Sequence, residues 1–271
     1  LVISAVFIGC TPILSIDAST QNVYHFSDTD KNISLLDISE TFGTYDGSFV
    51  LYDNNLDSWK IYDLEEATKR IPPESTYKIY DALLGLESGI ITPEHSSMTW
   101  NGDAFPFPSW EADQDLNSAM QNSVNWYFQA IDSQLGINRV QGFLNKIEYG
   151  NQTTSSNLDL YWSDFSLKIS PLEQVTLLKK FNTNEFHLNF QNVFSVKNAI
   201  KIASTPNGNF YGKTGTGRVN GQDINGWFIG YVETSDNSYY FATNIQSDSN
   251  ATGKKAFEIT SDILKKLHIW N

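Results

Sequence analysis

Cysteine and positive charge are the scarcest features of this 271-residue sequence, and each scarcity excludes a class of protein. The single Cys10 excludes an internal disulfide, and the four scattered histidines add no zinc-type ligand spacing, so we expect no metal. Only 18 Lys and Arg residues stand against 31 Asp and Glu, which leaves a formal net charge of -13. Such an acidic surface repels a phosphate backbone, so we expect no nucleic-acid partner.

Proline is also sparse, with 8 residues, while hydrophobic residues make up 40% of the chain. This composition is typical of a packed globular protein and argues against disorder. A length of 271 residues suits one compact domain, or one domain with a lobe inserted in it.

Residues 1–16 contain no charged side chain, which sets them apart from the rest of the chain. They are fewer than the roughly 20 apolar residues that cross a bilayer as a helix. Because the sequence starts at Leu1 rather than at Met, we interpret it as a fragment. The run predicts one of three structures, which are the end of a transmembrane helix, the apolar part of a secretory signal and a buried helix. Phe-Ile-Gly-Cys also resembles a lipoprotein cleavage site, in which Cys10 would be the lipid anchor. We favour the membrane and secretory interpretations, which place the rest of the chain outside the cytoplasm.

The order of predicted elements indicates the fold class. Residues 17–41 are expected to be a linker or irregular, and residues 42–271 to form the folded domain. Within it we expect a hairpin at 47–52 and 59–62, a helix from Ser75 that stops at Gly89, a mainly helical stretch over 90–200, strands near 210–214, 227–233 and 239–245, and a helix over 254–267. Strands at both ends with helices between them predict an α/β (α+β) fold, with a central antiparallel sheet flanked by helices and an inserted helical lobe.

Ser75 and Lys78 form a candidate catalytic pair, Ser-Thr-Tyr-Lys. On a helix, positions i and i+3 share a face, so the Lys78 amine can reach the Ser75 hydroxyl. A serine needs a base to become a nucleophile, and a lysine can be that base only when its pKa is lowered. Backbone N–H groups at the helix start would also face the developing negative charge. Ser-x-x-Lys nevertheless occurs about once by chance in a chain this long, so the pair alone decides nothing.

Two further motifs follow in the chain. Lys213-Thr214-Gly215 lies in a predicted strand, where a lysine and hydroxyls can bind a carboxylate and a glycine lets a substrate lie against the strand. Ser123-Val124-Asn125 lies in a predicted helical stretch and suits a short loop or a helix end that points two polar groups into a cleft. Each has a plain structural interpretation by itself, as a surface strand or a chance tripeptide. In this order, S-x-x-K, S-x-N and K-T-G are the motif set of penicillin-binding proteins and class A β-lactamases, and the set predicts an active serine.

Other residues make the resemblance more specific. Tyr149-Gly150-Asn151 resembles a motif of class D β-lactamases, and Trp162 follows where those enzymes place a Trp beside the active lysine. Over residues 42–267 the chain is most similar to the sensor domains of the BlaR/MecR penicillin-sensory transducers. The strings that carry this similarity are STYKIY from Ser75, MQNSVNWY from Met120, SLKIS from Ser166, GKTGTG from Gly212 and NGWFIGYVE from Asn225.

The resemblance implies a receptor at the cell membrane. In that family a β-lactam would acylate Ser75, the sensor domain stands on the extracellular face, and a preceding transmembrane helix anchors it. Residues 1–16 are then the tail of that helix. The signal would pass to a cytoplasmic zinc-protease part and derepress resistance genes. No His-Glu-x-x-His occurs in these 271 residues, so that part lies outside this sequence.

The resemblance also implies roles for the site residues. Ser123 and Lys213 join Ser75 and Lys78 as catalytic residues, and the backbone N–H groups of Ser75 and Thr216 form the oxyanion hole. Substrate contacts are assigned to Thr214, Gly215, Thr216 and Asn125. Trp162 and Asn125 line the lysine pocket. No bound cofactor is implied, but CO2 carboxylates the corresponding lysine of class D enzymes, so N-carboxylation of Lys78 is a further expectation.

Asn125 is the departure that separates a receptor from a hydrolase. Class D hydrolases carry an apolar Val there, whereas an amide can hydrogen-bond the Lys78 amine and favour loss of CO2 after acylation. Without a base to activate water, the acyl-enzyme would last, as a sensor requires. Whether the chain turns over therefore stays open, and a class D β-lactamase is the alternative function. A D-Ala-D-Ala transpeptidase is a second alternative, because Ser-x-Asn is also the penicillin-binding-protein form, but Tyr149 and Trp162 argue against it.

The residue that binds the substrate carboxylate is not evident. Class D enzymes use an Arg after the third strand, and residues 244–253 contain none. The hydroxyls of Thr214 and Thr216, or Lys254, are the expected substitutes.

Overall fold

The computed structural model describes residues 32–270, so the predictions for residues 1–16 and for Cys10 lie outside the described residues. Seven strands form one sheet in the order β1-β3-β2-β7-β6-β5-β4. The strands are β1 (Ile33–Leu35), β2 (Asp46–Asp53), β3 (Ser58–Tyr62), β4 (Lys201–Thr205), β5 (Gly208–Val219), β6 (Gln222–Thr234) and β7 (Ser238–Gln246). Every neighbouring pair is antiparallel except β1 with β3, which confirms the predicted central antiparallel sheet.

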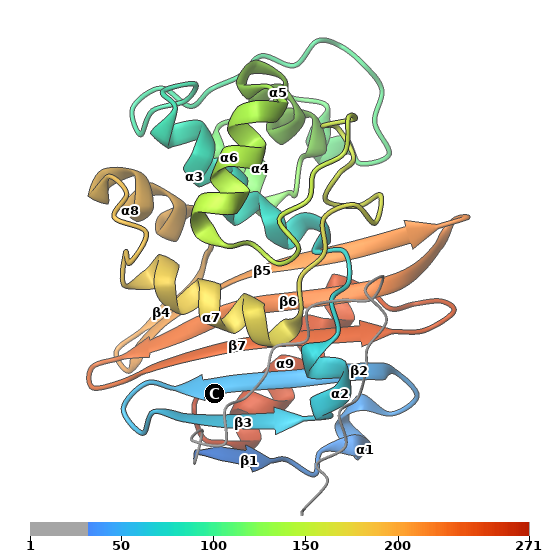
Figure 1. Cartoon of the computed structure of the whole chain (residues 1–271), viewed down its shortest axis with the longest axis vertical. Helices are drawn as coiled ribbons and strands as arrows, with labels where there is room; N and C mark the ends of the chain where they lie inside the picture. The colour runs from blue at the N-terminus through green and yellow to red at the C-terminus, as the bar shows by residue number, and fades with distance from the viewer. Residues whose placement is uncertain (1–31, 271) are drawn as a thin grey trace, which may run out of the picture.

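One short helix lies between β1 and β2, and the other helices fill the chain between β3 and β4 and after β7. They are α1 (Ser39–Phe42), α2 (Leu64–Thr68), α3 (Lys78–Glu87), α4 (Leu116–Gln121), α5 (Asn125–Leu135), α6 (Ile137–Ile147), α7 (Pro171–Asn182), α8 (Phe190–Ala199) and α9 (Gly253–Lys266), with 3-10 turns η1 (Glu74–Tyr77) and η2 (Pro108–Trp110). In Figure 1, α7 lies across the front of the sheet and α9 behind it, while α3 to α6 and α8 form a lobe above β5. The predicted inserted helical lobe is therefore present.

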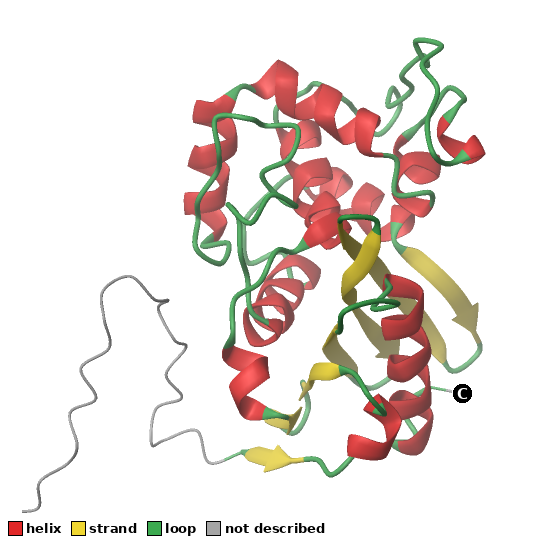
Figure 2. Cartoon of the chain, turned by 90° about the vertical axis from the view of Figure 1, so that its right-hand side faces the viewer, coloured by secondary structure: helices red, strands yellow, loops and turns green. Residues whose placement is uncertain are grey.

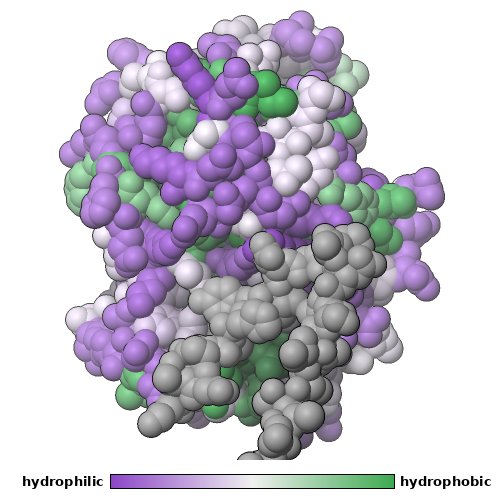
Figure 3. Space-filling view, in the orientation of Figure 1, coloured by the Kyte–Doolittle hydropathy of each residue, from purple (hydrophilic) through white to green (hydrophobic). Residues whose placement is uncertain are grey.

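The central strands bury side chains on both faces, and this arrangement joins the lobe to the sheet. Along β2, Phe49 and Leu51 point to the α9 face, while Val50 and Tyr52 point to the face that carries α7. The core on the α7 face continues without interruption into the lobe, where it includes Phe128 of α5. Figure 2 shows this layering from the side, and Figure 3 shows a largely hydrophilic outer face with small separate apolar patches. The lobe and the sheet thus share one core.

The hairpin of β5 and β6 carries one wall of the site and has a tight turn. Val219 pairs with Gln222 across the sheet, so only Asn220 and Gly221 form the loop. Both have positive φ, 50° and 80°, which an Asn-Gly turn accepts and which matches the twist of the strands. The register of this long hairpin is therefore fixed close to the site.

Three local expectations need correction. Ser75 lies in the 3-10 turn η1 rather than in an α-helix, because α3 begins only at Lys78. The helical stretch predicted around Ser123 breaks between α4 and α5, where Ser123 has a φ of 54° that no helix contains. The segment 17–41, expected to be irregular, contributes β1 to the sheet edge and most of α1. The domain boundary expected at residue 42 stays a prediction.

Candidate active site

The turn that presents Ser75 is held by the sheet. Asn225 Nδ2 and Trp227 Nε1, both from β6, donate hydrogen bonds of 3.1 and 2.8 Å to the Pro72 carbonyl. Glu74, next to the nucleophile, has a φ of 52°, and its backbone N–H donates to the Trp162 carbonyl at 3.1 Å. These bonds stabilise a left-handed backbone that would otherwise be unfavourable. The chain therefore enters α3 in one geometry, with Ser75 half-buried at the mouth of a cleft.

Lys78 is the buried partner of Ser75. Its Nζ lies 2.8 Å from Ser75 Oγ and 2.7 Å from Asn125 Oδ1, and the residue is 1% exposed. The Phe128 and Trp162 rings lie at 5.6 and 5.5 Å from Nζ, so the pocket wall is aromatic. Burial lowers the pKa of Lys78 to about 8, against the opposing effect of nearby carboxyl groups. A neutral amine is thus accessible at mild pH within reach of the hydroxyl that it must deprotonate.

Ser123 and Lys213 face each other across the cleft. Ser123 lies in the break between α4 and α5, and Lys213 Nζ donates hydrogen bonds to Ser123 Oγ and, at 2.9 Å, to the Thr214 carbonyl. Lys213 is buried, and both its burial and the charge of Lys78 hold its pKa well below the usual range. The helix break thus connects the lobe to β5 through a hydroxyl and an amine.

Gly215 lets β5 approach the nucleophile turn. A Cβ at Gly215 would lie 3.0 Å from Glu74 Cβ and 3.1 Å from the Pro73 carbonyl oxygen. The sequence argument expected this glycine to make room for substrate alone, whereas the structure shows that it also makes room for the turn that carries Ser75. Thr216 Oγ1 accepts a hydrogen bond of 2.8 Å from the backbone N–H of Gly253 at the start of α9.

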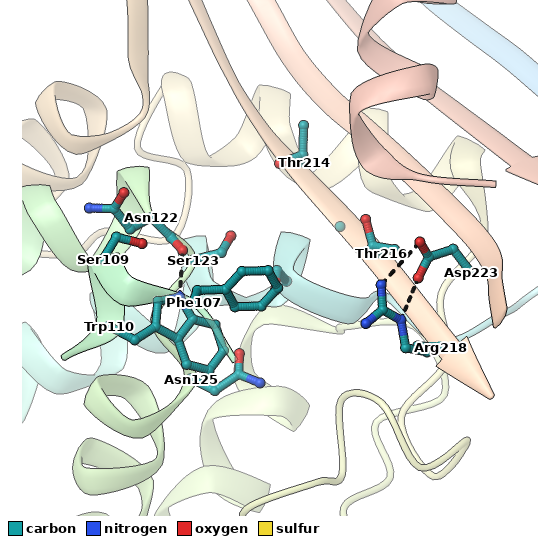
Figure 4. A pocket seen from close by; sticks show the side chains of 12 residues that line it. Phe107, Ser109, Trp110, Asn122, Ser123, Asn125, Thr214, Thr216, Arg218 and Asp223 are labelled. Carbon is teal, nitrogen blue, oxygen red and sulfur yellow. Dashed lines mark hydrogen bonds and ion pairs between the residues drawn. The ribbon is translucent and has the colours of Figure 1, made fainter. Parts of the chain in front are cut away.

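A cleft of about 340 Å³ lies between β5 and the lobe, and its lining includes Ser75, Ser123, Asn125, Thr214, Gly215 and Thr216. Figure 4 shows Ser109, Trp110, Asn122, Ser123 and Asn125 on the lobe side, and Thr214, Thr216, Arg218 and Asp223 on the strand side. The structure therefore brings together Ser75, Lys78, Ser123, Asn125, Trp162, Lys213, Thr214, Gly215 and Thr216, which are all the site residues expected from the sequence.

Sequence reasoning missed the ion pair at the open end of the cleft. Arg218 Nε and Nη2 donate to the two carboxylate oxygens of Asp223 at 2.7 and 3.2 Å. It also missed Phe107 and Trp110, which line the cleft as well. Arg218 could have been predicted from the strand alternation, because it lies two residues after Thr216 and its side chain therefore points to the same face of β5. By contrast, Lys254 is exposed and does not line the cleft.

The Tyr149-Gly150-Asn151 motif supports the wall of the lysine pocket. Tyr149 is buried with its ring edge-on to Tyr77 at 5.2 Å and to Tyr80 at 5.1 Å. Asn151 binds the backbone of the segment 166–168. Its side chain donates to the Ser166 carbonyl at 2.7 Å and accepts from the Lys168 N–H at 2.9 Å. The motif acts through packing around α3, and it does not touch Ser75 in these contacts.

Three buried carboxyl groups surround the base of the site. Burial raises the pKa of Glu74 to about 8, although the Asn225 amide donates to it at 3.2 Å. Burial also raises the pKa of Asp81 on α3 and of Asp132 on α5. Among residues 32–270 no cluster of His, Cys, Asp and Glu is placed to hold a metal ion, and none of the helices has the length and apolar content to cross a membrane.

Comparison with known proteins places this geometry in a family. The model of the penicillin binding protein transpeptidase domain matches residues 47–265. Regulatory protein BlaR1 of Bacillus licheniformis is 45% identical over the full chain, and the methicillin resistance mecR1 protein of Staphylococcus aureus (strain Mu50) is 39% identical over 97% of it. The chain spans about half the length of these two curated relatives, 45% and 46%.

Solved structures agree with the sequence relatives. The C-terminal domain of the Bacillus licheniformis BlaR penicillin-receptor superposes with a TM-score of 0.86 at 46% identity, over 89% of this chain and 98% of that one. A class D beta-lactamase from Bacillus subtilis reaches a TM-score of 0.82 at 36% identity, over 87% of this chain and 97% of that one. The chain therefore belongs to the penicillin-binding protein transpeptidase family and, within it, to the BlaR/MecR group of class D β-lactamase-like sensor domains.

Proposed function

We propose that this chain is a β-lactam sensor in which Ser75 is acylated once and holds the antibiotic as a long-lived ester. The observation that carries the proposal is the 2.7 Å hydrogen bond between Lys78 Nζ and Asn125 Oδ1. By accepting this bond, Asn125 stabilises the uncarboxylated Lys78 over the carbamate that a class D hydrolase uses to activate water.

Acylation follows from the geometry of the cleft. The Ser75 hydroxyl gives its proton to the neutral Lys78 amine 2.8 Å away, and Oγ attacks the β-lactam carbonyl carbon. The carbon–nitrogen bond of the ring breaks, and the leaving nitrogen takes a proton from Ser123, while the ammonium group of Lys213, which donates to Ser123 on its other side, replaces that proton. The backbone N–H groups of Ser75 and Thr216 are proposed to stabilise the oxyanion.

Deacylation is the step that the site is proposed to suppress. In class D enzymes a carboxylated lysine acts as base in both steps, and we propose that Lys78 can be carboxylated by CO2 in its aromatic pocket before acylation. Asn125 offers the free amine a hydrogen bond that an apolar side chain cannot offer, so it favours the amine over the carbamate. Once the carbamate is lost, no strong base faces the ester, and the adduct persists.

Recognition of the substrate carboxylate is proposed to involve Arg218. It lines the cleft on the same strand as Thr214 and Thr216, and its side chain is 57% exposed. Two of its five N–H donors point to Asp223, which leaves others for an anionic ligand. Arg218 thus replaces Lys254 as the proposed cation.

The wider role is a proposal that extends beyond this chain. We infer that the domain stands on the extracellular face of a cell membrane, anchored through residues upstream of the described ones, and that acylation induces resistance genes. Two relatives support this inference, because one is a penicillin-receptor and the other is a methicillin resistance protein.

Intact mass spectrometry after a brief exposure to benzylpenicillin tests the proposal. A single adduct at Ser75 that persists for hours is expected, with one equivalent of nitrocefin consumed and no further hydrolysis. Return to the free mass within minutes, with continued linear nitrocefin hydrolysis, would instead establish a class D β-lactamase. The aromatic pocket around Lys78 favours that second function, because a dry pocket is what a lysine carbamate requires.

A further inference from the structure

The interface of α3 and α5 carries two polar pairs, one behind the other. Lys78 and Asp81 are three residues apart on α3, so they share one face of the helix. Asn125 and Asp132 are seven residues apart on α5, which is two turns and again one face. Lys78 hydrogen-bonds Asn125 at the cleft, and Asp81 and Asp132 lie behind them with no exposed surface.

The two carboxyl groups face each other without an external donor on the Asp81 side. The carboxyl groups of Asp81 and Asp132 lie close enough that each shifts the pKa of the other. The Tyr161 hydroxyl donates to Asp132 Oδ1 at 3.4 Å, but among the described residues neither Asp81 oxygen nor Asp132 Oδ2 has a hydrogen-bond partner. Two ionised carboxylates in contact, shut off from water, repel strongly, and one proton between them removes the repulsion and supplies the missing donor.

The charges around Lys78 identify what the pair acts upon. Three carboxyl groups act on its ammonium form, which are Asp81 from α3, Glu74 from η1 and Asp132 from α5. Lys213 from β5 opposes them as a like charge. The remaining neighbours, the Phe128 and Trp162 rings, are uncharged. With one shared proton the aspartate pair carries a single negative charge next to the Lys78 amine.

We propose that Asp81 and Asp132 share one proton and form a buried counter-ion that holds Lys78 as an ammonium ion in the acyl-enzyme. The inference rests on the proposed sensor function and adds a second cause for the long life of the ester. After acylation Lys78 keeps the proton that it took from Ser75, and the ammonium ion has no lone pair with which to activate water or to bind CO2. A carbamate on Lys78 would also place a second negative charge beside the pair. The two aspartates are positioning residues, because they act through Lys78 and touch no substrate.

The shared proton makes an unusual prediction about variants. In Asp81→Asn or Asp132→Asn, the new amide N–H replaces the shared O–H as donor, and the remaining carboxylate keeps the single negative charge. Each single variant should therefore stay within about twofold of the wild type in adduct lifetime. In the double variant Asp81→Asn/Asp132→Asn the charge is gone, so the pKa of Lys78 should fall further.

The experiment compares these variants on the whole chain. Adduct lifetime is followed by intact mass after a benzylpenicillin pulse, acylation rate is measured from pH 6 to 9, and carbamate is detected by ¹³C NMR with ¹³C-labelled bicarbonate. In the double variant we expect the lifetime of the adduct to be about tenfold shorter and the carbamate signal to be stronger. The rise of the acylation rate with pH should occur about one pH unit lower than in the wild type. A pair that only packs α3 against α5 would move neither the pH limb nor the carbamate signal.

Several results would overturn the inference. If the double variant folds and keeps the wild-type adduct lifetime and the wild-type pH dependence of acylation, the pair carries no charge that affects the pKa of Lys78. A full effect in either single variant would show that the proton is not shared. Asp81→Leu/Asp132→Ala provides a second charge-free pair should the first fail to fold. These outcomes are distinct from failure of the sensor function, which would appear as rapid loss of the adduct in the wild type itself.

Discussion

In the proposed sensor function Lys78 must serve two opposite needs, because a free amine is required to activate Ser75 and must then be withheld from water. Burial makes the free amine available for Ser75 by lowering the pKa of Lys78 to about 8. Asn125 helps to withhold the amine from water through its 2.7 Å hydrogen bond. The same side chain is therefore a base before acylation and a poor base after it. This change of role depends on one amide oxygen.

The pH dependence of acylation follows from the pKa of Lys78. The neutral amine is the active form, and it predominates only above a pKa of about 8. Below that value the fraction of neutral amine falls about tenfold per pH unit, so the second-order acylation rate should rise with pH up to about 8 and then level off. Stopped-flow measurements with nitrocefin from pH 6 to 9 check this limb. A rate that is flat across this range would exclude Lys78 as the titrating base.

Replacement of Asn125 tests its role directly. Asn125→Val removes the acceptor for the Lys78 amine and makes the pocket more apolar, so deacylation should speed up by at least about tenfold. Intact mass of the benzylpenicillin adduct over time measures the rate. Asn122→Val is the matched control, since Asn122 also lines the cleft but donates to the Ser118 carbonyl at 3.0 Å. Equal lifetimes in the wild type and Asn125→Val would refute the account of this residue.

Substitutions of Arg218 and of Asp223 should change the acylation efficiency in opposite directions. Arg218→Gln should lower acylation efficiency by about tenfold for β-lactams with a free carboxylate, since one charge-assisted hydrogen bond is worth about 1.5–3 kcal/mol. Asp223→Asn releases Arg218 from its partner and removes a negative charge from the cleft, so efficiency should rise. Competition against nitrocefin gives both values. A decrease in both variants would mean that the ion pair only supports the hairpin.

At the scale of elements, β5 and the nucleophile turn depend on each other. A Cβ at Gly217 would overlap the Glu74 carboxyl and lie 3.1 Å from Asn225 Cβ. Gly217→Ala should therefore push the strand from the turn, with a loss of about 1–3 kcal/mol in the free energy of unfolding and slower acylation. The control is Gly142→Ala in α6, where a Cβ meets nothing within 4 Å and a gain of about 0.5–1 kcal/mol is expected. Urea unfolding and nitrocefin acylation separate the two cases, and an unperturbed Gly217→Ala would contradict the proposed contact.

The helix break between α4 and α5 is the second element that the site depends on. The break gives Ser123 a φ of 54°, and α5 starts at Asn125. The two polar residues of the site therefore flank a single residue, Val124. Val124 is fully buried and anchors the break in the lobe core. The tripeptide therefore needs its central apolar residue as much as its polar ones.

At the scale of the whole molecule, the lobe and the sheet share one continuous core around a preformed cleft. Acylation should therefore proceed without rearrangement of the domain. Benzylpenicillin should leave the far-UV circular dichroism unchanged and raise Tm by about 2–4 °C, the shift that about 1 kcal/mol of new contacts gives in a domain of this size. A loss of helical signal on acylation would instead indicate that the lobe opens.

The sequence by itself determined the fold class, and it predicted a set of reacting residues that the structure brings close together. The two strand groups with helices between them indicated the antiparallel sheet and its inserted lobe, and three short motifs named Ser75, Ser123 and Lys213. These predictions depend on local patterns, namely the i, i+3 spacing of a helix and the alternation of a strand, so one sequence suffices for them. The same local logic failed at Ser75 and Ser123, because tertiary contacts impose the 3-10 turn and the helix break.

Only the tertiary structure decided which distant residues meet. Asp81 and Asp132 lie on separate helices, and nothing in either segment predicts a buried carboxyl pair behind Lys78. Arg218 enters the cleft because the Asn220-Gly221 turn fixes the register of β5 against β6 and places Asp223 beside it. Such pairings depend on helix packing and strand register across the whole core, which short motifs do not encode.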